Sequence, residues 1–252
     1  MRAVPALIVV VIACLGPWLA PHGVDDSIGN PFAPPSSAAW LGTDRLGHDV
    51  FSQLLNGGWG LIALAAFIAG VVTGASSVLG AVVALWPRLG AVIERCADLL
   101  ILLPVVLALL MVVMSWPQWG TAGVVIVGIV FGIPYCARVF AAAATPIAAS
   151  GYIEAARLGG ESAGYVIFRE MLPNMRELLL TQLGLRFVAG MYIVATAAFL
   201  RLPTGLGAAN WAIMVRDNAS GILLDPWAVL APSAAIGIVA VSVNLLAGGR
   251  RE

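Results

Sequence analysis

The chain has 252 residues, of which 61% are hydrophobic and 10% are charged, and its formal net charge is zero. These values lie outside the range of soluble globular proteins and indicate that lipid surrounds several long apolar segments. The neutral net charge gives no indication of a nucleic-acid partner. All 13 basic residues are arginines. Because a P-loop needs a lysine to reach the phosphates of a nucleotide, ATP hydrolysis at a Walker A site is excluded.

Six apolar segments are long enough to cross a bilayer, so we expect an all-α, polytopic membrane protein with six transmembrane helices. The expected spans are Ala3–Ala20, Gly60–Trp86, Cys96–Ser115, Thr121–Phe140, Leu178–Leu200 and Trp227–Leu246. The first span has some features of a secretory signal. It follows a single arginine, and proline stands directly after the small residue at its end, so we expect it to remain uncleaved.

The distribution of arginines predicts the orientation of the chain. With the N-terminus in the cytoplasm, nine arginines lie on the cytoplasmic side, namely Arg2, Arg88, Arg95, Arg138, Arg157, Arg169, Arg176, Arg250 and Arg251. Only Arg45, Arg201 and Arg216 lie outside. Because basic residues are enriched in cytoplasmic loops, we expect both termini in the cytoplasm. The chain then divides into a first transmembrane helix (1–20), an extracytoplasmic segment (21–59) and a five-helix core (60–252).

The extracytoplasmic segment is rich in proline, glycine, serine and aspartate until its last part. Apolar residues at positions 46, 50, 51, 54 and 55 would share one face of a helix, so we expect a short amphipathic surface helix there. The two histidines, His22 and His48, lack the spacing of a HExxH zinc site, and the three cysteines form no CxxC motif. We therefore expect no metal site and no disulfide.

A polar loop at about 145–176 carries the most distinctive pattern. It contains the run Glu154-Ala155-Ala156-Arg157-Leu158-Gly159-Gly160 and, after nine further residues, Glu170-Met171-Leu172-Pro173-Asn174. An amphipathic loop of this length between two spans indicates a soluble partner. Residues 160–164 also spell GxSxG, the nucleophile elbow of hydrolases. That motif needs a nearby histidine, and both histidines are expected across the membrane, so the hydrolase interpretation is disfavoured.

Three separated blocks resemble one family, the dipeptide, oligopeptide and nickel ABC importer permeases. Leu41-Gly42-Thr43-Asp44, Leu46-Gly47 and Asp49 resemble the LGTDxLGRD segment that follows their first span. The loop at 154–174 resembles their EAA loop, and Pro226-Trp227, Pro232 and Asn244-Leu245-Leu246 resemble their final span. The resemblance implies a type I permease fold, the second or "C" type of permease subunit, and a multi-pass protein of the bacterial inner membrane.

The resemblance also implies partners. A second permease subunit, two ATP-binding subunits and an extracytoplasmic solute-binding protein would complete the importer, and ATP would be bound by the partners, so this chain would need no cofactor and carry no catalytic residues. In the family, the EAA loop forms a short helix that docks on the ATPase. The residues that would carry this role are Glu154, Ala155, Ala156, Gly159, Gly160, Leu172 and Pro173.

Each of these residues has an expected part in the coupling loop. Glu154 would form hydrogen bonds at the interface or cap the helix, and Ala155 and Ala156 would keep the helix surface flat. The Gly159-Gly160 pair would permit a sharp turn if the backbone needs a positive φ. Leu172-Pro173 would end the loop before the fifth span begins.

Two arginines of the fifth span are further candidates. Arg186 is the clear charge inside a span, about 12 Å from its cytoplasmic end by the helical rise. It could pair with Glu177 or Asp98, or take part in the pathway. Arg201 stands at the outer end of the span, where the family often has glycine, and it is likewise a candidate for a pathway or a structural role.

The expected cargo is a peptide on family grounds, and nickel or a metal chelate is the alternative. An ion-coupled secondary transporter is the rival from another class. It would require paired acidic residues in the middle of the spans, and the sequence has none there.

Overall fold

The computed structural model describes residues 16–202, 205–207 and 209–248, so the expected first span Ala3–Ala20 lies mostly outside the described residues. The described residues form helices and loops with two isolated β-bridges, which confirms the all-α class. The helices are α2 (Val50–Leu85), α3 (Pro87–Ile101), α4 (Val105–Ser115), η1 (Pro117–Trp119), α5 (Thr121–Ala148), α6 (Gly151–Leu158), α7 (Ala163–Tyr165), η2 (Val166–Met171), α8 (Leu172–Asn174), α9 (Arg176–Phe199), α10 (Trp211–Asn218), η3 (Ala219–Gly221) and α11 (Trp227–Gly248).

Four of these helices, α2, α5, α9 and α11, are long and apolar enough to cross a bilayer. Helices α3 and α4 form a fifth span if they are counted together. They are separated by a short break, at which the helix direction changes by 85°. Both counts refer to the described residues, and the expected span at 3–20 is not among them. The chain is therefore a polytopic helical membrane protein.

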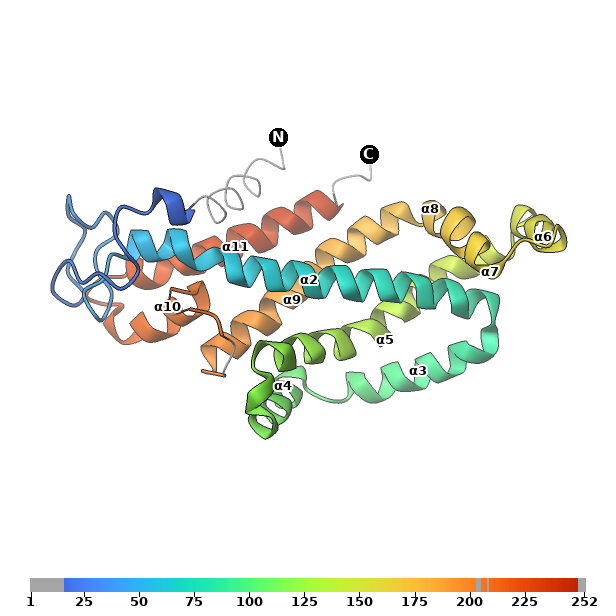
Figure 1. Ribbon diagram of the computed structural model, residues 1–252, viewed down its shortest axis with the longest axis horizontal. Helices are drawn as coiled ribbons and strands as arrows, with labels where there is room; N and C mark the ends of the chain where they lie inside the picture. Colours follow the sequence, from blue (N-terminus) through green and yellow to red (C-terminus); the bar gives the residue numbers. More distant parts are fainter. Residues whose placement is uncertain (1–15, 203–204, 208, 249–252) are drawn as a thin grey trace.

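Helix α2 runs along the long axis of the molecule and packs against α5 and α9 (Figure 1). Small residues permit this close packing. A Cβ atom at Gly80 would lie 2.5 Å from the Cβ atom of Phe140 on α5, and one at Gly190 on α9 would lie 3.0 Å from the carbonyl oxygen of Ala65 on α2. Glycine at such contacts lets helix backbones approach within a membrane, where apolar side chains alone give no preference for protein over lipid.

The second span begins ten residues earlier than the expected Gly60. Helix α2 starts at Val50, because the carboxylate of Asp49 accepts hydrogen bonds from the backbone N–H groups of Phe51 and Ser52, at 3.2 and 3.1 Å, and so caps the helix. The expected separate surface helix around residues 46–55 is therefore wrong. Its apolar face belongs to the first turns of the span itself.

The segment before α2 is held together by a buried carboxylate. The side chain of Asp44 accepts hydrogen bonds from the backbone N–H groups of Leu46 and His48, at 2.8 and 2.9 Å, and from Nε2 of Gln53 at 2.9 Å. Gly47 takes a φ of +82°, which a side chain would disfavour. The Leu41–Asp49 block thus forms a folded turn that joins the segment at residues 21–48 to α2.

The third span is interrupted, whereas the sequence predicted one helix over Cys96–Ser115. The break falls between α3 and α4, where Pro104 is extended with φ −60° and ψ 120° and stands at the N-cap of α4. Proline has no N–H group and disfavours a helical conformation in the residue before it, so the chain leaves the helix before Pro104. Pro134 and Pro232 instead lie inside α5 and α11, which continue past them.

Candidate coupling and translocation sites

The residues predicted to contact an ATPase lie at one end of the molecule. Helices α6 and α7 occupy the end of the long axis that is opposite to the segment at residues 21–48 (Figure 1). Most residues of α6 are exposed. The polar loop of the sequence is therefore a compact helical element at the tip of the helical bundle.

Two contacts fix α6 to the rest of the chain. Ile153 is completely buried and belongs to the same core cluster as Val166 and Met171 of η2. The amide of Asn174 in α8 donates a hydrogen bond to the hydroxyl oxygen of Tyr152 at 3.1 Å. An apolar anchor and a polar tie thus connect α6 to the stretch that leads into α9.

The end of α6 explains the glycine pair. The N–H group of Gly160 donates to the carbonyl of Arg157 at 3.2 Å, and that of Glu161 donates to the carbonyl of Ala156 at 3.1 Å. This is the Schellman arrangement, and Gly160 occupies its left-handed position with a φ of +83°. Gly159 has a φ of −72°, so only one of the two glycines has the positive φ that the sequence suggested for the pair.

The outward surface of α6 combines apolar and acidic groups. Leu158 is 84% exposed, Glu154 and Ala155 are exposed, and Ala156 is half-buried against the core. The expected capping role of Glu154 is wrong: the N-cap is Ser150, and the carboxylate of Glu154 has no hydrogen-bond or ion-pair partner in the described part of the chain. Glu154 and Leu158 lie four residues apart and so share a helix face.

Leu172 and Pro173 lie just before the break at Met175 that precedes α9, and their part in an ATPase contact stays a prediction. They belong to α8, which continues the π-helix η2 without a gap, and the chain enters α9 after Met175 alone. Leu172 is half-buried and Pro173 is exposed. Residues 163–199 are therefore almost continuously helical, so the chain passes from α7 into α9 with a single break at Met175.

The GxSxG pattern has a local structural role. The hydroxyl of Ser162 accepts a hydrogen bond from the N–H group of Tyr165 at 3.2 Å and caps α7. His22 and His48 lie in the external segment, at the opposite end of the molecule (Figure 1). The arrangement that a hydrolase requires is absent around this serine in the described structure.

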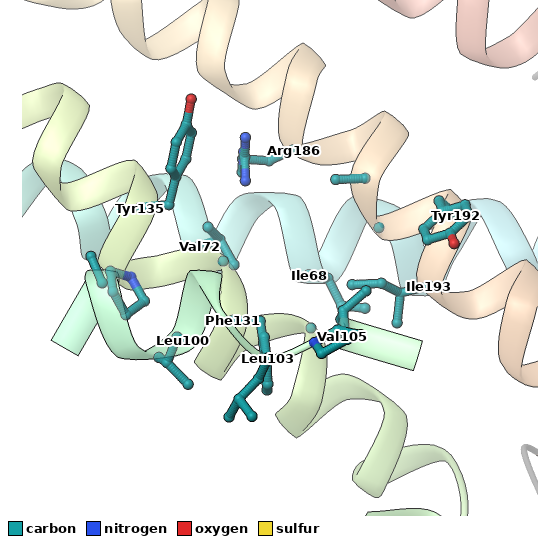
Figure 2. A pocket seen from close by; sticks show the side chains of 17 residues that line it. Ile68, Val72, Leu100, Leu103, Val105, Phe131, Tyr135, Arg186, Tyr192 and Ile193 are labelled. Carbon is teal, nitrogen blue, oxygen red and sulfur yellow. The ribbon is translucent and has the colours of Figure 1, made fainter. Parts of the chain in front are cut away.

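Arg186 lies ten residues into α9, about 15 Å along the helix from its first residue. Its guanidinium carbon is 5.3 Å from the centroid of the Tyr135 ring (Figure 2), and its buried Nε has no hydrogen-bond partner among the described residues. The proposed pairing with Asp98 is wrong, because Asp98 pairs with Arg138 at 3.0 Å. Within the described part of the chain, no ion pair joins Arg186 to Glu177 either.

Arg201, just after the C-terminal end of α9, has an unusual backbone conformation for a residue with a side chain. Its N–H group donates to the carbonyl of Ala198 and that of Leu202 to the carbonyl of Ala197, both at 3.1 Å, so Arg201 holds the left-handed position of a second Schellman arrangement with a φ of +59°. Its exposed side chain lies 3.7 Å from the carboxylate of Asp217. Arginine thus occupies a backbone position that favours glycine.

The sequence did not single out three residues that the structure brings to these sites. Ile153 anchors α6, Tyr152 ties it to α8, and Tyr135 lies against Arg186. Ile153 carried a usable signal, since an aliphatic residue directly before Glu-Ala-Ala interrupts a polar stretch. The Tyr135 contact joins two helices and has no local signature.

The fold defines a multi-pass helical membrane protein that presents a short, anchored helix at one end. Residues 76–249 match the family of binding-protein-dependent transport system inner membrane components, and the chain belongs to this family. The resemblance seen in the sequence is confirmed. The helical permease fold expected from it is confirmed as well.

Curated relatives agree with this assignment over nearly the whole chain. The peptide transport system permease protein SapC of Escherichia coli O6:H1 is 32% identical over 261 residues, which cover 96% of this chain and 84% of SapC. The glutathione transport system permease protein GsiD of Pectobacterium atrosepticum is 30% identical, with 98% and 82% covered. DdpC of Escherichia coli K12, named for a D,D-dipeptide transport system, is 29% identical, with 99% and 84% covered.

Proposed function

We propose that this chain is one of the two permease subunits of an ATP-driven importer for peptides. The family establishes an inner-membrane component of a binding-protein-dependent transport system. The peptide cargo is supported by relatives whose names assign them to peptide, dipeptide and glutathione transport. Nickel or a metal chelate receives no support from the described residues, which contain no group of three histidine, cysteine or acidic side chains suited to a metal ion.

The observation that carries the coupling role is the exposure of α6. Leu158 is 84% exposed on a helix that the chain orders through Ile153, and the exposed carboxylate of Glu154 on the same face is free to accept a donor from a partner. Both features are accounted for if a groove of an ATP-binding subunit covers this face and supplies a donor for Glu154. Helix-in-groove docking uses such a small set of apolar and polar contacts.

The tip that carries α6 would face the cytoplasm. Arg157 and Arg169 lie in this region, and Arg138 lies in the α5 helix that leads to it, whereas Arg45 and Arg216 lie at the opposite end. Basic residues are enriched on the cytoplasmic side of membrane proteins, so we propose that both termini are cytoplasmic too.

The connection between α6 and α9 would transmit movement of the ATPase to the membrane. Ile153 and the Tyr152–Asn174 hydrogen bond tie α6 to η2 and α8, and α8 passes into α9 through Met175. A displacement of α6 would therefore shift the fifth span rather than be absorbed by a flexible loop. Rigid-body movement of helices about an interface is a common way to convert binding at one site into opening at another.

The remaining components would be supplied in trans. Without a lysine the chain has no Walker A site, so two partner subunits would bind and hydrolyse ATP, and this chain would have no enzymatic activity of its own. A second permease would complete the pathway across the lipid bilayer. A solute-binding protein would deliver cargo at the external end.

The test is retention of the ATP-binding subunits when the tagged chain is purified in a gentle detergent. Leu158→Asp places a second charge beside Glu154 and removes an apolar contact worth about 1.5–3 kcal/mol, so we expect at least a tenfold loss of the co-purifying ATPase. Leu223→Asp is the matched control. Leu223 is 95% exposed and lies between η3 and α11, at the end of the molecule opposite to α6. It should leave ATPase retention unchanged.

Equal retention in both variants would contradict the docking surface. Purification of the wild-type chain without any ATP-binding protein, together with ATP-independent uptake after reconstitution, would instead support an ion-coupled secondary transporter. Membrane abundance measured in parallel separates loss of docking from loss of folding.

A further inference from the structure

Arg186 projects into a cavity of about 440 Å³ that lies between α2, α5, α9 and the bend between α3 and α4 (Figure 2). The walls are largely aliphatic and aromatic, with Val72, Phe131 and Ile193 among them. Among the described lining residues Arg186 carries the only charge, and no acidic side chain lines the cavity. The cavity therefore places one positive charge in an apolar environment near the middle of a span.

This charge lacks a counter-ion within the described part of the chain. Tyr135 offers its ring at 5.3 Å, and the buried Nε of Arg186 donates to no acceptor there. The nearby carboxylate of Asp98 is already engaged by Arg138. A guanidinium group in an apolar cavity favours an anion that can accept two parallel hydrogen bonds, and a carboxylate has this geometry.

The break in the third span adds to the same preference. Helix α4 begins at Val105, which lines the cavity (Figure 2). Pro104 lines it as well. The first N–H groups of a helix have no partner within the helix, and the helix dipole places partial positive charge there. The cavity thus joins a guanidinium group and a helix start, both of which favour negative charge.

We propose that Arg186 is a binding residue for the cargo and receives the C-terminal carboxylate of a peptide within the pathway. This proposal rests on the proposed import of peptides. A peptide that enters an apolar pathway needs a partner for its terminal carboxylate, since an unpaired charge there is costly. Arg186 meets this need and gives the pathway a preference for cargo with a free carboxyl end.

The experiment compares uptake of two tripeptide pools by the complete importer reconstituted in proteoliposomes. One pool has free C-termini, the other has the same sequences with C-terminal amides, and imported peptides are quantified by mass spectrometry. The wild-type importer should take up the free pool at least about tenfold faster, which corresponds to about 1.4 kcal/mol. In Arg186→Gln this ratio should fall about tenfold relative to the wild type, and Arg186→Lys should restore part of it.

Dividing the wild-type ratio by the variant ratio cancels any preference of the solute-binding protein, because that protein is the same in every sample. Arg95→Gln removes an exposed charge of α3 that does not line the cavity and should leave the ratio unchanged. An unchanged ratio in Arg186→Gln would overturn the proposal while leaving peptide import intact. Two other results in Arg186→Gln would also overturn it. If uptake of both pools falls equally and the second permease no longer co-purifies, Arg186 pairs with an acidic residue of that partner. If uptake of both pools falls equally and the fall depends on anionic lipid, Arg186 pairs with a lipid headgroup. No ATP-dependent uptake of either pool by wild type would refute the peptide function itself.

Discussion

The glycine that ends α6 provides a sharp test of the coupling geometry. Gly160 has a φ of +83°, and a Cβ atom built on it would meet no other atom within 4 Å. A substitution there is therefore penalised by backbone conformation alone, without a steric clash. For a residue with a side chain this penalty is about 1–2 kcal/mol. This cost destabilises the turn that ends α6 and does not affect the packing of the buried core.

A penalty of about 1.4 kcal/mol corresponds to a tenfold shift between the closed turn and a frayed end of α6. Gly160→Ala should therefore reduce ATP-driven uptake, and retention of the ATP-binding subunits, by up to roughly that factor. Gly160→Val should reduce both further, since a β-branched side chain is a stronger outlier at positive φ. Membrane abundance should stay near that of the wild type for both variants.

Gly159→Ala is the matched control. Gly159 has an ordinary helical φ of −72°, and its Cβ would lie 3.3–3.4 Å from two carbonyl oxygens of α6 itself. Uptake and retention should then remain within about twofold of the wild type, since alanine is favoured over glycine in a helix. Equal losses for the two alanine variants would refute the argument from backbone conformation, because it assigns the penalty to Gly160 alone.

Two further predictions concern the external end. Arg201→Gly should raise the free energy of unfolding, with a gain of about 1–2 kcal/mol from relief of positive φ against about 0–1 kcal/mol lost with the exposed Asp217 pair; a lower Tm in detergent would contradict this. Burial raises the pKa of Asp225, whose Oδ2 has no partner in the described structure while Oδ1 accepts from the Trp227 N–H at 3.2 Å. Since the folded state then holds its proton more tightly than the unfolded state, wild-type stability should fall as pH rises from the ordinary aspartate value through the raised pKa. Asp225→Asn keeps the capping oxygen and should flatten this part of the Tm–pH curve, and parallel curves would count against the effect.

The helical class and the position of the polar segment between α5 and α9 were predictable because both depend on local composition. Long apolar runs must satisfy their backbone groups internally in lipid, which leaves helices as the solution. The polar segment at 151–174 differs from these runs so strongly that its boundaries are visible in the sequence. Gly160 was identified for the same reason, since a glycine just after a short helix is a frequent C-terminal signal.

The break in the third span and the early start of α2 were less accessible. The apolar run around Leu102–Pro104 continues on both sides, so hydropathy alone does not distinguish a kink from a complete interruption. At Val50 one helix was predicted as two. An amphipathic pattern passes into a fully apolar one there, and the sequence analysis assigned the first to a surface helix and the second to a span, although the helix is continuous. Asp49 was the local signal for a single start, since aspartate before an apolar run is a strong N-cap.

The partners of the charged groups could not be read from the sequence because they depend on how helices rotate against each other. Asp98 was a reasonable candidate for Arg186, yet α3 presents it to Arg138 on α5, at 3.0 Å. An arginine inside a span costs about 2.5–3.5 kcal/mol when it faces lipid at the helix centre. A charge of this cost is retained only where something offsets it, and the described residues of this chain offer Tyr135 alone.

The positions of α6 and Arg186 on one helical path connect the two proposals. The chain from η2 through α8 into α9 is helical apart from Met175, and Arg186 lies about 15 Å beyond Arg176, the first residue of α9. A shift of α6 produced by closure of the ATPases would therefore move α9 and alter the distance between Arg186 and the α4 helix start across the cavity. Because an ion pair weakens steeply as its partners separate or become hydrated, the same movement that opens the pathway would release a carboxylate held at Arg186.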